Sequence, residues 1–232
     1  RVMFLLEPGK GAGITDMLVR WGVIAGNDVI VDQQMRLFQG LTLGLDPVVS
    51  TYGKHPSVGS LQERTIFSVA RSVTVLEGFE PAIVRVPLAF TSRTSWAERD
   101  PERLFSKSEA SLDDSDLKGP VPLAVAASAY VKDLEGGDSE SGAEFEMLVF
   151  GDSTFVTNKY WRQLFNDALA LSGVGWLAGE EQRISIGPRA VRASRAYLTQ
   201  AQARTVFYLS VLVIPELILL AGIAVWWRRS AL

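Results

Sequence analysis

Along most of the chain, apolar residues form short runs bounded by polar, glycine or proline residues. Runs of this length that are rich in Val, Ile, Leu and Phe predict buried β-strands. The predicted strands are residues 2–6, 29–32, 72–76, 82–90, 121–131 and 145–150. Two segments lack such runs: residues 91–120 are polar and residues 132–143 are acidic, so both are predicted to be surface loops.

Helical spacing follows two of these strands. Met17, Leu18 and Trp21 mark one face of a short helix that ends at Gly22, and a second apolar stripe covers 161–169 before Gly173 and Gly175. The opening order of strand, helix and strand is typical of a parallel arrangement. We therefore predict an α/β fold with an open, mostly parallel sheet and flanking helices.

One apolar run is far longer than the others. Residues 206–227 (VFYLSVLVIPELILLAGIAVWW) contain one carboxylate and no basic residue. As a helix this run spans about 33 Å, enough to cross a hydrocarbon core of roughly 30 Å. Trp226 and Trp227 lie at its end, where aromatic rings favour the membrane interface. The run predicts a single transmembrane helix in contact with lipid.

Charge next to the span sets its orientation. Arg228 and Arg229 follow at once, and basic residues favour the cytoplasmic side. We expect an extracytoplasmic domain over 1–198, a helical lead-in over 199–205, the span over 206–227 and a cytoplasmic tail over 228–232. This places the domain on the periplasmic side of the inner membrane. Because no signal segment precedes the first strand, we expect the chain to be the C-terminal part of a longer protein, with part of its domain missing.

Composition excludes several functions. The net charge of −3 gives no basic field for nucleic acid, and the lack of cysteine removes thiolate metal sites and disulfides. The chain has one histidine, which argues against a histidine-rich metal site. We therefore predict no metal, no cofactor and no nucleic-acid partner.

The sequence Gly-Asp-Ser-Thr-Phe, residues 151–155, is the strongest candidate site. It comes directly after the predicted strand 145–150, and ligands of open α/β sheets bind beyond the carboxyl ends of strands. The candidate ligand-binding residues are Asp152, Ser153, Thr154, Asn158 and Asp32, the last at the end of another predicted strand. A structural alternative is that Asp152 and Ser153 cap the next helix while Asn158 ties the loop by hydrogen bonds.

Gly-Asp-Ser also opens the motif of a class of serine esterases, so hydrolysis of envelope ester or glycan bonds by Ser153 and Asp152 is the alternative function. Those esterases carry their motif early and a D-x-x-H late, whereas no histidine comes after Ser153 here. The only candidate base is His55, which precedes Pro56 in a turn-rich region. No catalytic residue is therefore assigned. A purely structural module of a membrane complex is the third possibility.

A carboxylate interrupts the predicted span. Glu216 lies at its middle, directly after Pro215, and an ionised side chain at that depth is costly unless it is neutral or paired. Either Glu216 is tolerated as a neutral acid, or Glu216 and Pro215 mark the face that packs on a partner membrane protein. On an α-helix, Leu212, Val213, Leu219 and Leu220 share its side.

Several short sequences occur in an order typical of one family. They are W-G-V-x-x-x-x-D-V-I-V-D from Trp21 to Asp32, H-P at 55–56, A-R-S-V at 70–73, T-S-x-x-S-W-x-E at 91–98, K-G-P-V-P-L-A-V-A at 118–126 and G-D-S-T-F-V-T-N at 151–158. With the C-terminal span, they resemble the C-terminal part of the gliding-motility-type auxiliary proteins of ABC transport systems.

This resemblance implies an extracytoplasmic domain with a fold similar to class I glutamine amidotransferases but without their nucleophile. It also implies association with an ABC-2-type permease and a cytoplasmic ATPase. Catalytic residues are not assigned in the family, so none is carried over. The expected function is that of a non-catalytic membrane-anchored auxiliary subunit that binds a substrate or an envelope partner.

Overall fold

The structure is a computed structural model, and it describes residues 1–33, 43–59, 61–134, 142–179, 205 and 207–230. The chain divides into two units, Arg1–Pro188 and Arg189–Leu232, and each is described by itself. The predicted domain boundary at residue 198 and the lead-in before Thr205 lie outside the described residues.

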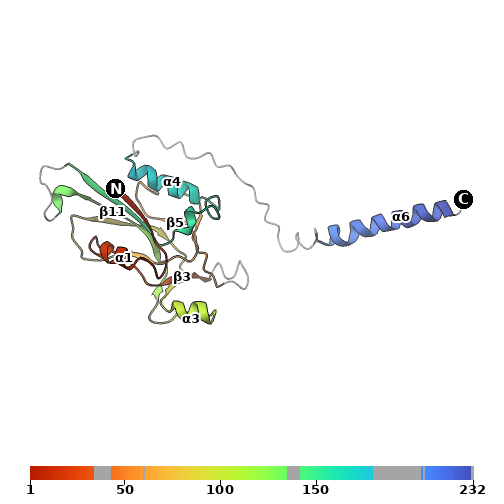
Figure 1. Ribbon diagram of the computed structural model, residues 1–232, viewed down its shortest axis with the longest axis horizontal. Coiled ribbons are helices and arrows are strands. Elements are labelled where there is room, and N and C mark those ends of the chain that lie inside the picture. Colours follow the sequence, from red (N-terminus) through yellow and green to blue (C-terminus); the bar gives the residue numbers. More distant parts are fainter. Residues whose placement is uncertain (34–42, 60, 135–141, 180–204, 206, 231–232) are drawn as a thin grey trace. The chain divides into compact units, whose positions relative to one another are not determined.

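A five-stranded sheet forms the centre of the first unit (Figure 1). In sheet order its strands are β1 (Val2–Leu5), β12 (Glu144–Phe150), β11 (Pro122–Tyr130), β8 (Val84–Phe90) and β5 (Thr51–Tyr52). Only β1 and β12 run parallel, while the other three neighbouring pairs are antiparallel. The mixed α/β class is confirmed. The open, mostly parallel sheet expected from the sequence is not, because three of the four pairings have the opposite sense.

The central strands are apolar throughout because both faces of the sheet are covered. Along β12, Leu148 and Phe150 enter one hydrophobic cluster with α4 (Asn166–Leu177), and Met147 and Val149 enter another. This second cluster includes Leu18 of α1 (Ala12–Val19). Figure 1 shows β11 between these two helices. A strand buried on both faces reads as a continuous apolar run, which is why the strands could be found from the sequence.

The pairing of β2 (Val23–Ala25) explains why the parallel prediction was wrong. The chain does run through β1, α1 and β2, as the sequence predicted. However, β2 pairs antiparallel with β7 (Val73–Val75) in a separate two-stranded sheet and does not join β1. The opening helix therefore connects two different sheets.

The remaining strands form two smaller sheets. One contains β10 (Leu117–Lys118), β9 (Ser95–Glu98) and β3 (Val29–Asp32), and the other contains β4 (Val48–Val49) and β6 (Thr65–Ile66). A short helix, α3 (Pro101–Ser106), adds Leu104 to the cluster around Trp96. The prediction that 91–120 is a loop was therefore wrong, because the polar stretch contains two strands and a helix. In the predicted loop 132–143, residues 135–141 are not among the described residues. A 3₁₀ turn, η1 (Val131–Asp133), comes before them.

The second predicted helix was placed too early. The apolar stripe over 161–169 begins in turns, and Leu164 has a φ of 52°, which an α-helix does not allow. Helix α4 begins only at Asn166 and runs through both Gly173 and Gly175, which were expected to end it. A Cβ at position 173 would lie 3.0 Å from the Leu148 side chain, so this glycine allows α4 to approach the sheet closely.

The C-terminal unit contains a long apolar helix. A π-helical turn, η3 (Leu209–Val213), leads into α6 (Ile214–Ser230). Residues Leu209–Arg229 are long and apolar enough, by length and composition, to cross a membrane, and an 18-residue stretch within them has a mean hydropathy of 2.3. The described residues contain one such helix, in agreement with the predicted span.

Candidate functional site

The parallel pair of strands places two loops side by side. Leu5 is opposite Phe150 in the register, and the Leu6 N–H continues the pairing by donating to the Phe150 carbonyl at 2.9 Å. Parallel strands end at the same edge of a sheet, so the residues just beyond them meet there. Glu7 and Asp152 each lie two positions beyond the paired residues Leu5 and Phe150.

Gly151 fixes the path of the chain as it leaves β12. Its N–H donates to the Leu123 carbonyl at 2.8 Å, and its carbonyl accepts from the Arg71 N–H at 2.8 Å. A Cβ at this position would lie 2.1 Å from the Arg71 carbonyl oxygen. Because that neighbour is backbone, only glycine fits without a shift of one of the two segments.

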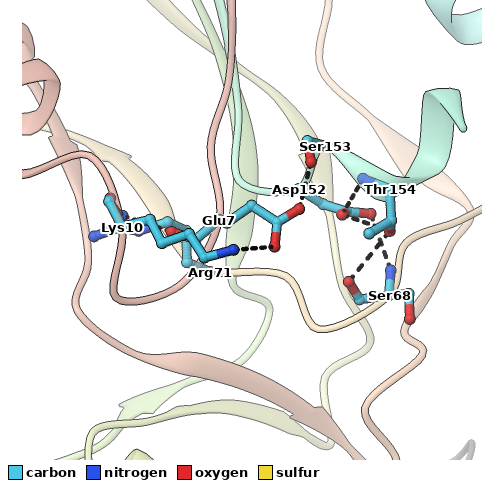
Figure 2. Close-up of polar contacts among 7 residues, drawn as sticks. All are labelled: Glu7, Lys10, Ser68, Arg71, Asp152, Ser153 and Thr154. Atoms are coloured by element: carbon cyan, nitrogen blue, oxygen red, sulfur yellow. Dashed lines mark hydrogen bonds and ion pairs between the residues drawn. The ribbon is translucent and has the colours of Figure 1, made fainter.

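Asp152 is buried and organises the next turn of the chain. One carboxylate oxygen accepts hydrogen bonds from the Thr154 N–H and hydroxyl, both at 2.6 Å, and the other accepts from the Ser68 N–H at 3.0 Å. Figure 2 shows these contacts joining two segments that are distant in sequence. The Tyr160 hydroxyl donates to the Ser68 hydroxyl at 3.0 Å on the same side. Burial raises the pKa of Asp152 above its ordinary value, and the hydrogen bonds oppose that rise.

Ser153 faces the other loop. Its hydroxyl donates to a carboxylate oxygen of Glu7, and Lys10 places its ammonium 4.0 Å from the second oxygen (Figure 2). The Lys10 side chain is 76% exposed, so this ion pair contributes little to stability. We name the set Glu7, Ser68, Asp152, Ser153 and Thr154 the strand-end cluster. It gathers two carboxylates and three hydroxyls, a combination that can hydrogen-bond a polar ligand.

Arg71 supports the strand-end cluster but does not offer its charge to it. The guanidinium donates to four backbone carbonyls, those of Glu7, Lys10, Ala25 and Gly26, at 2.5–3.1 Å. The residue is 3% exposed, and burial lowers its pKa. These bonds hold the loop after β1 against the end of β2. Arg71 therefore acts as a structural clamp.

The structure separates the five residues predicted to bind a ligand. Asp152, Ser153 and Thr154 lie together at the strand ends, as the sequence predicted. Asp32 ends a strand of a different sheet, and its carboxylate accepts from the Ser92 hydroxyl at 2.8 Å. Asn158 is exposed. The structure thus brings three of the five together and places Glu7 and Ser68 beside them, which sequence spacing alone did not indicate.

The structural alternative expects Asp152 and Ser153 to cap a helix and organise the turn: Asp152 does organise the turn through its bonds to the Ser68 and Thr154 N–H groups, but no α-helix begins there. The element after Asp152 is η2 (Thr154–Val156), a single 3₁₀ turn without a side-chain cap from Ser153. The asparagine that ties the loop is Asn166, which is fully buried. Its amide accepts from the Ile66 N–H at 2.9 Å and donates to the Ile66 carbonyl at 2.8 Å and the Tyr160 carbonyl at 3.2 Å. A polar residue inside an apolar helical stripe was the available signal for it.

His55, the only imidazole of the chain, lies in a different environment from Ser153. Its Nδ1 accepts from the Ser57 N–H at 3.2 Å and lies 2.8 Å from the Ser57 hydroxyl, and its ring packs edge-on against Trp176 with centroids 4.7 Å apart. Burial lowers its pKa. It lines a surface hollow of about 500 Å³ whose lining does not include Ser153. The geometry therefore does not join the serine to the histidine.

Three carboxylates elsewhere could hold a metal ion. Oxygens of Glu98, Asp113 and Asp116 lie within 4.8 Å of one another. Each also accepts hydrogen bonds from nearby backbone, such as the Arg99 N–H to Asp116 at 3.0 Å. Hydrogen bonds from Ser115 lower the pKa of Asp113. This group lies in the segment predicted to be a loop, and sequence analysis did not identify it.

Replacing Asp152 tests its structural role. We expect Asp152→Ala to lower the free energy of unfolding by about 2–3 kcal/mol, because it leaves the Ser68 and Thr154 N–H groups without their acceptor. Ser153→Ala should cost less than about 1 kcal/mol, since it removes one partly exposed hydrogen bond. Urea unfolding of both variants measures the difference. Equal stability of Asp152→Ala and the wild type would contradict the proposed role.

The fold and the strand-end cluster define the protein as a mixed α/β domain with a polar site at the ends of two parallel strands. No protein family and no curated protein matches the sequence. Among solved structures, the chain is similar to one described as "mmIFT52 N-terminal domain", with a TM-score of 0.48 and 15% identity. The alignment covers 76% of this chain and 63% of that one.

Proposed function

We propose that the protein is a non-catalytic, membrane-anchored auxiliary subunit of an ABC transporter, acting with an ABC-2-type permease and a cytoplasmic ATPase. The apolar helix over Leu209–Arg229 is the observation that supports membrane anchoring. The observation that favours binding is the strand-end cluster, where the partly exposed Glu7, Ser153 and Thr154 place a carboxylate and two hydroxyls at one sheet edge, supported by the buried Asp152. The transporter assignment rests on the family resemblance of the sequence.

The proposed location is the inner membrane, with the domain on the periplasmic side. Arg228 and Arg229 close the helix and favour the cytoplasmic side for its C-terminal end. We also propose a relation to class I glutamine amidotransferase-like folds. The parallel pair of β1 and β12, with a polar turn beyond its end, supports that relation.

The contacts of Ser153 favour binding over hydrolysis. A serine nucleophile needs a base that can accept its proton and is itself held in place. The Ser153 hydroxyl donates to Glu7, a carboxylate whose side chain is 31% exposed, while His55 is bonded to Ser57. The envelope hydrolase that uses Ser153 and Asp152 is therefore the less favoured function. Ester hydrolysis by the wild type that is lost in Ser153→Ala would reverse this order.

Membrane fractionation and affinity purification test the proposal together. We expect the full chain to remain in membranes after alkaline extraction, and protease added to spheroplasts to digest the domain while a cytoplasmic marker stays intact. Purification from gently solubilised membranes should recover a multi-span permease and an ATPase. Release of the chain by alkali would contradict the anchor, protection of the domain would reverse the orientation, and absence of both proteins would contradict the transporter assignment.

A further inference from the structure

The role of the apolar helix as a membrane anchor does not explain Glu216. It lies 12 positions after Arg204 and 12 before Arg228, and it is the only charged residue of 206–227. Twelve residues of helix correspond to about 18 Å, farther than an arginine side chain reaches. Arg228 of the same helix therefore cannot neutralise it. The residue is exposed on the isolated helix.

The backbone next to Glu216 is also irregular. The π-helical turn over Leu209–Val213 ends with the Ile214 N–H donating to the Leu209 carbonyl, five residues back. Pro215 comes next and carries no N–H, so the preceding turn loses one helical donor. In a membrane, backbone acceptors without water must find another donor. Because π-helical turns are rare and often occur at functional sites, the turn over Leu209–Val213 is informative.

These two features meet on one part of the helix. A helical side chain leans toward the N-terminal turn, so the Glu216 carboxylate reaches back toward the π-helical turn. The carboxylate and the acceptor-rich turn then form one polar patch, which we name the mid-span notch: residues 209–213, Pro215 and Glu216. The notch offers the Glu216 carboxyl and backbone carbonyls as acceptors, while its one side-chain donor among the described residues, the Ser210 hydroxyl, already donates to the Phe207 carbonyl at 3.2 Å.

We infer that the mid-span notch binds an arginine or lysine side chain carried by a membrane helix of a partner protein. A basic side chain supplies the positive charge that Glu216 requires and the N–H donors that the turn requires. This inference deepens the proposed function and rests on the helix being a membrane span. It also names the chemistry of the partner helix, which the family resemblance does not.

A second copy of this chain does not fit the notch. Its span contains no basic residue, so a symmetric pair would bring two Glu216 carboxylates together. An antiparallel pair that keeps both Glu216 residues at the middle of the membrane would leave Arg228 about 18 Å away along the axis. Charge complementarity therefore requires a different protein.

Site-specific photo-crosslinking in membranes identifies the occupant. A photoreactive amino acid replaces Leu219 or Leu220, on the Glu216 side of α6, or Ile218, on the opposite side. In the free helix these three are similarly exposed, at 63%, 61% and 67%. We expect adducts at 219 and 220 but not 218, with a peptide from another protein that has Arg or Lys within one helical turn of the crosslink. Adducts only with this chain, only with lipid, or equally from all three positions would overturn the inference.

Variants of Glu216 test the charge. We expect Glu216→Gln and Glu216→Leu each to reduce the adduct at 220 about 5-fold, the size typical of one strong polar contact between membrane helices. Reversing the charge as Glu216→Arg should abolish it, and exchanging the partner's basic residue for glutamate should restore it. A wild-type yield in Glu216→Gln would overturn the inference. Alkaline extraction of each variant is measured in parallel: a chain that leaves the membrane contradicts the proposed function, whereas an inserted chain with unchanged adducts contradicts only the notch.

Discussion

Gly151→Ala should destabilise the domain by about 3 kcal/mol, the upper part of the usual range for overpacking. The added methyl group would lie 2.1 Å from the Arg71 carbonyl oxygen, which is backbone and cannot rotate away. Either β12 or the segment at Arg71 must move, and the hydrogen bond between the Arg71 N–H and the Gly151 carbonyl would be lost. The urea midpoint of the full chain in detergent measures the change. The same shift would displace Asp152 and Ser153 from Glu7 and Ser68.

Gly175→Ala is the matched control for this substitution. Position 175 lies inside α4, and a Cβ built there meets no atom within 4 Å. Alanine is the better helix former by about 0.5–1 kcal/mol, so this variant should be as stable as the wild type or more stable. The two substitutions add the same methyl group and should have opposite effects. Similar destabilisation by both would mean that close packing at Gly151 is not the cause.

Asn166→Ala should lower the free energy of unfolding by about 3 kcal/mol. The side chain satisfies both the N–H and the carbonyl of Ile66, and a lost partner for a buried polar group costs roughly 1–3 kcal/mol. It also joins β6 to the Tyr160 turn that precedes α4. Alanine leaves these backbone groups buried without a partner. Urea unfolding should therefore show a lower midpoint.

Asn158→Ala removes a side chain of the same kind from the same loop region. Asn158 is exposed, so its replacement should change the unfolding free energy by less than about 0.5 kcal/mol. Asn166→Asp separates the two functions of the buried amide. It keeps an acceptor for the Ile66 N–H but turns its second oxygen toward the Ile66 and Tyr160 carbonyls, so it should be no more stable than the alanine variant. An effect of Asn158→Ala as large as that of Asn166→Ala would contradict the assigned contacts.

The sequence by itself determined the elements whose residues carry their own signal. Strands buried on both faces, such as β12 and β11, are continuous apolar runs, and their positions were predicted within one or two residues. The long apolar helix was likewise identified from length and composition. The position of Asp152, Ser153 and Thr154 after a core strand came from the same runs, because a polar turn after a buried strand must lie at the edge of a sheet.

Only the tertiary structure decided how these elements pair and which distant residues meet. The sense of each strand depends on partners far away in sequence, so the local order of β1, α1 and β2 could not show that β2 pairs with β7. Glu7 and Ser68 join Asp152 and Ser153 because the register of β1 with β12 and the Gly151–Arg71 contact bring three loops together. Asn158 and Asn166 are the same amino acid, so the sequence alone does not distinguish their roles. Burial separates them, because a buried amide must find partners in the protein, whereas an exposed one has water.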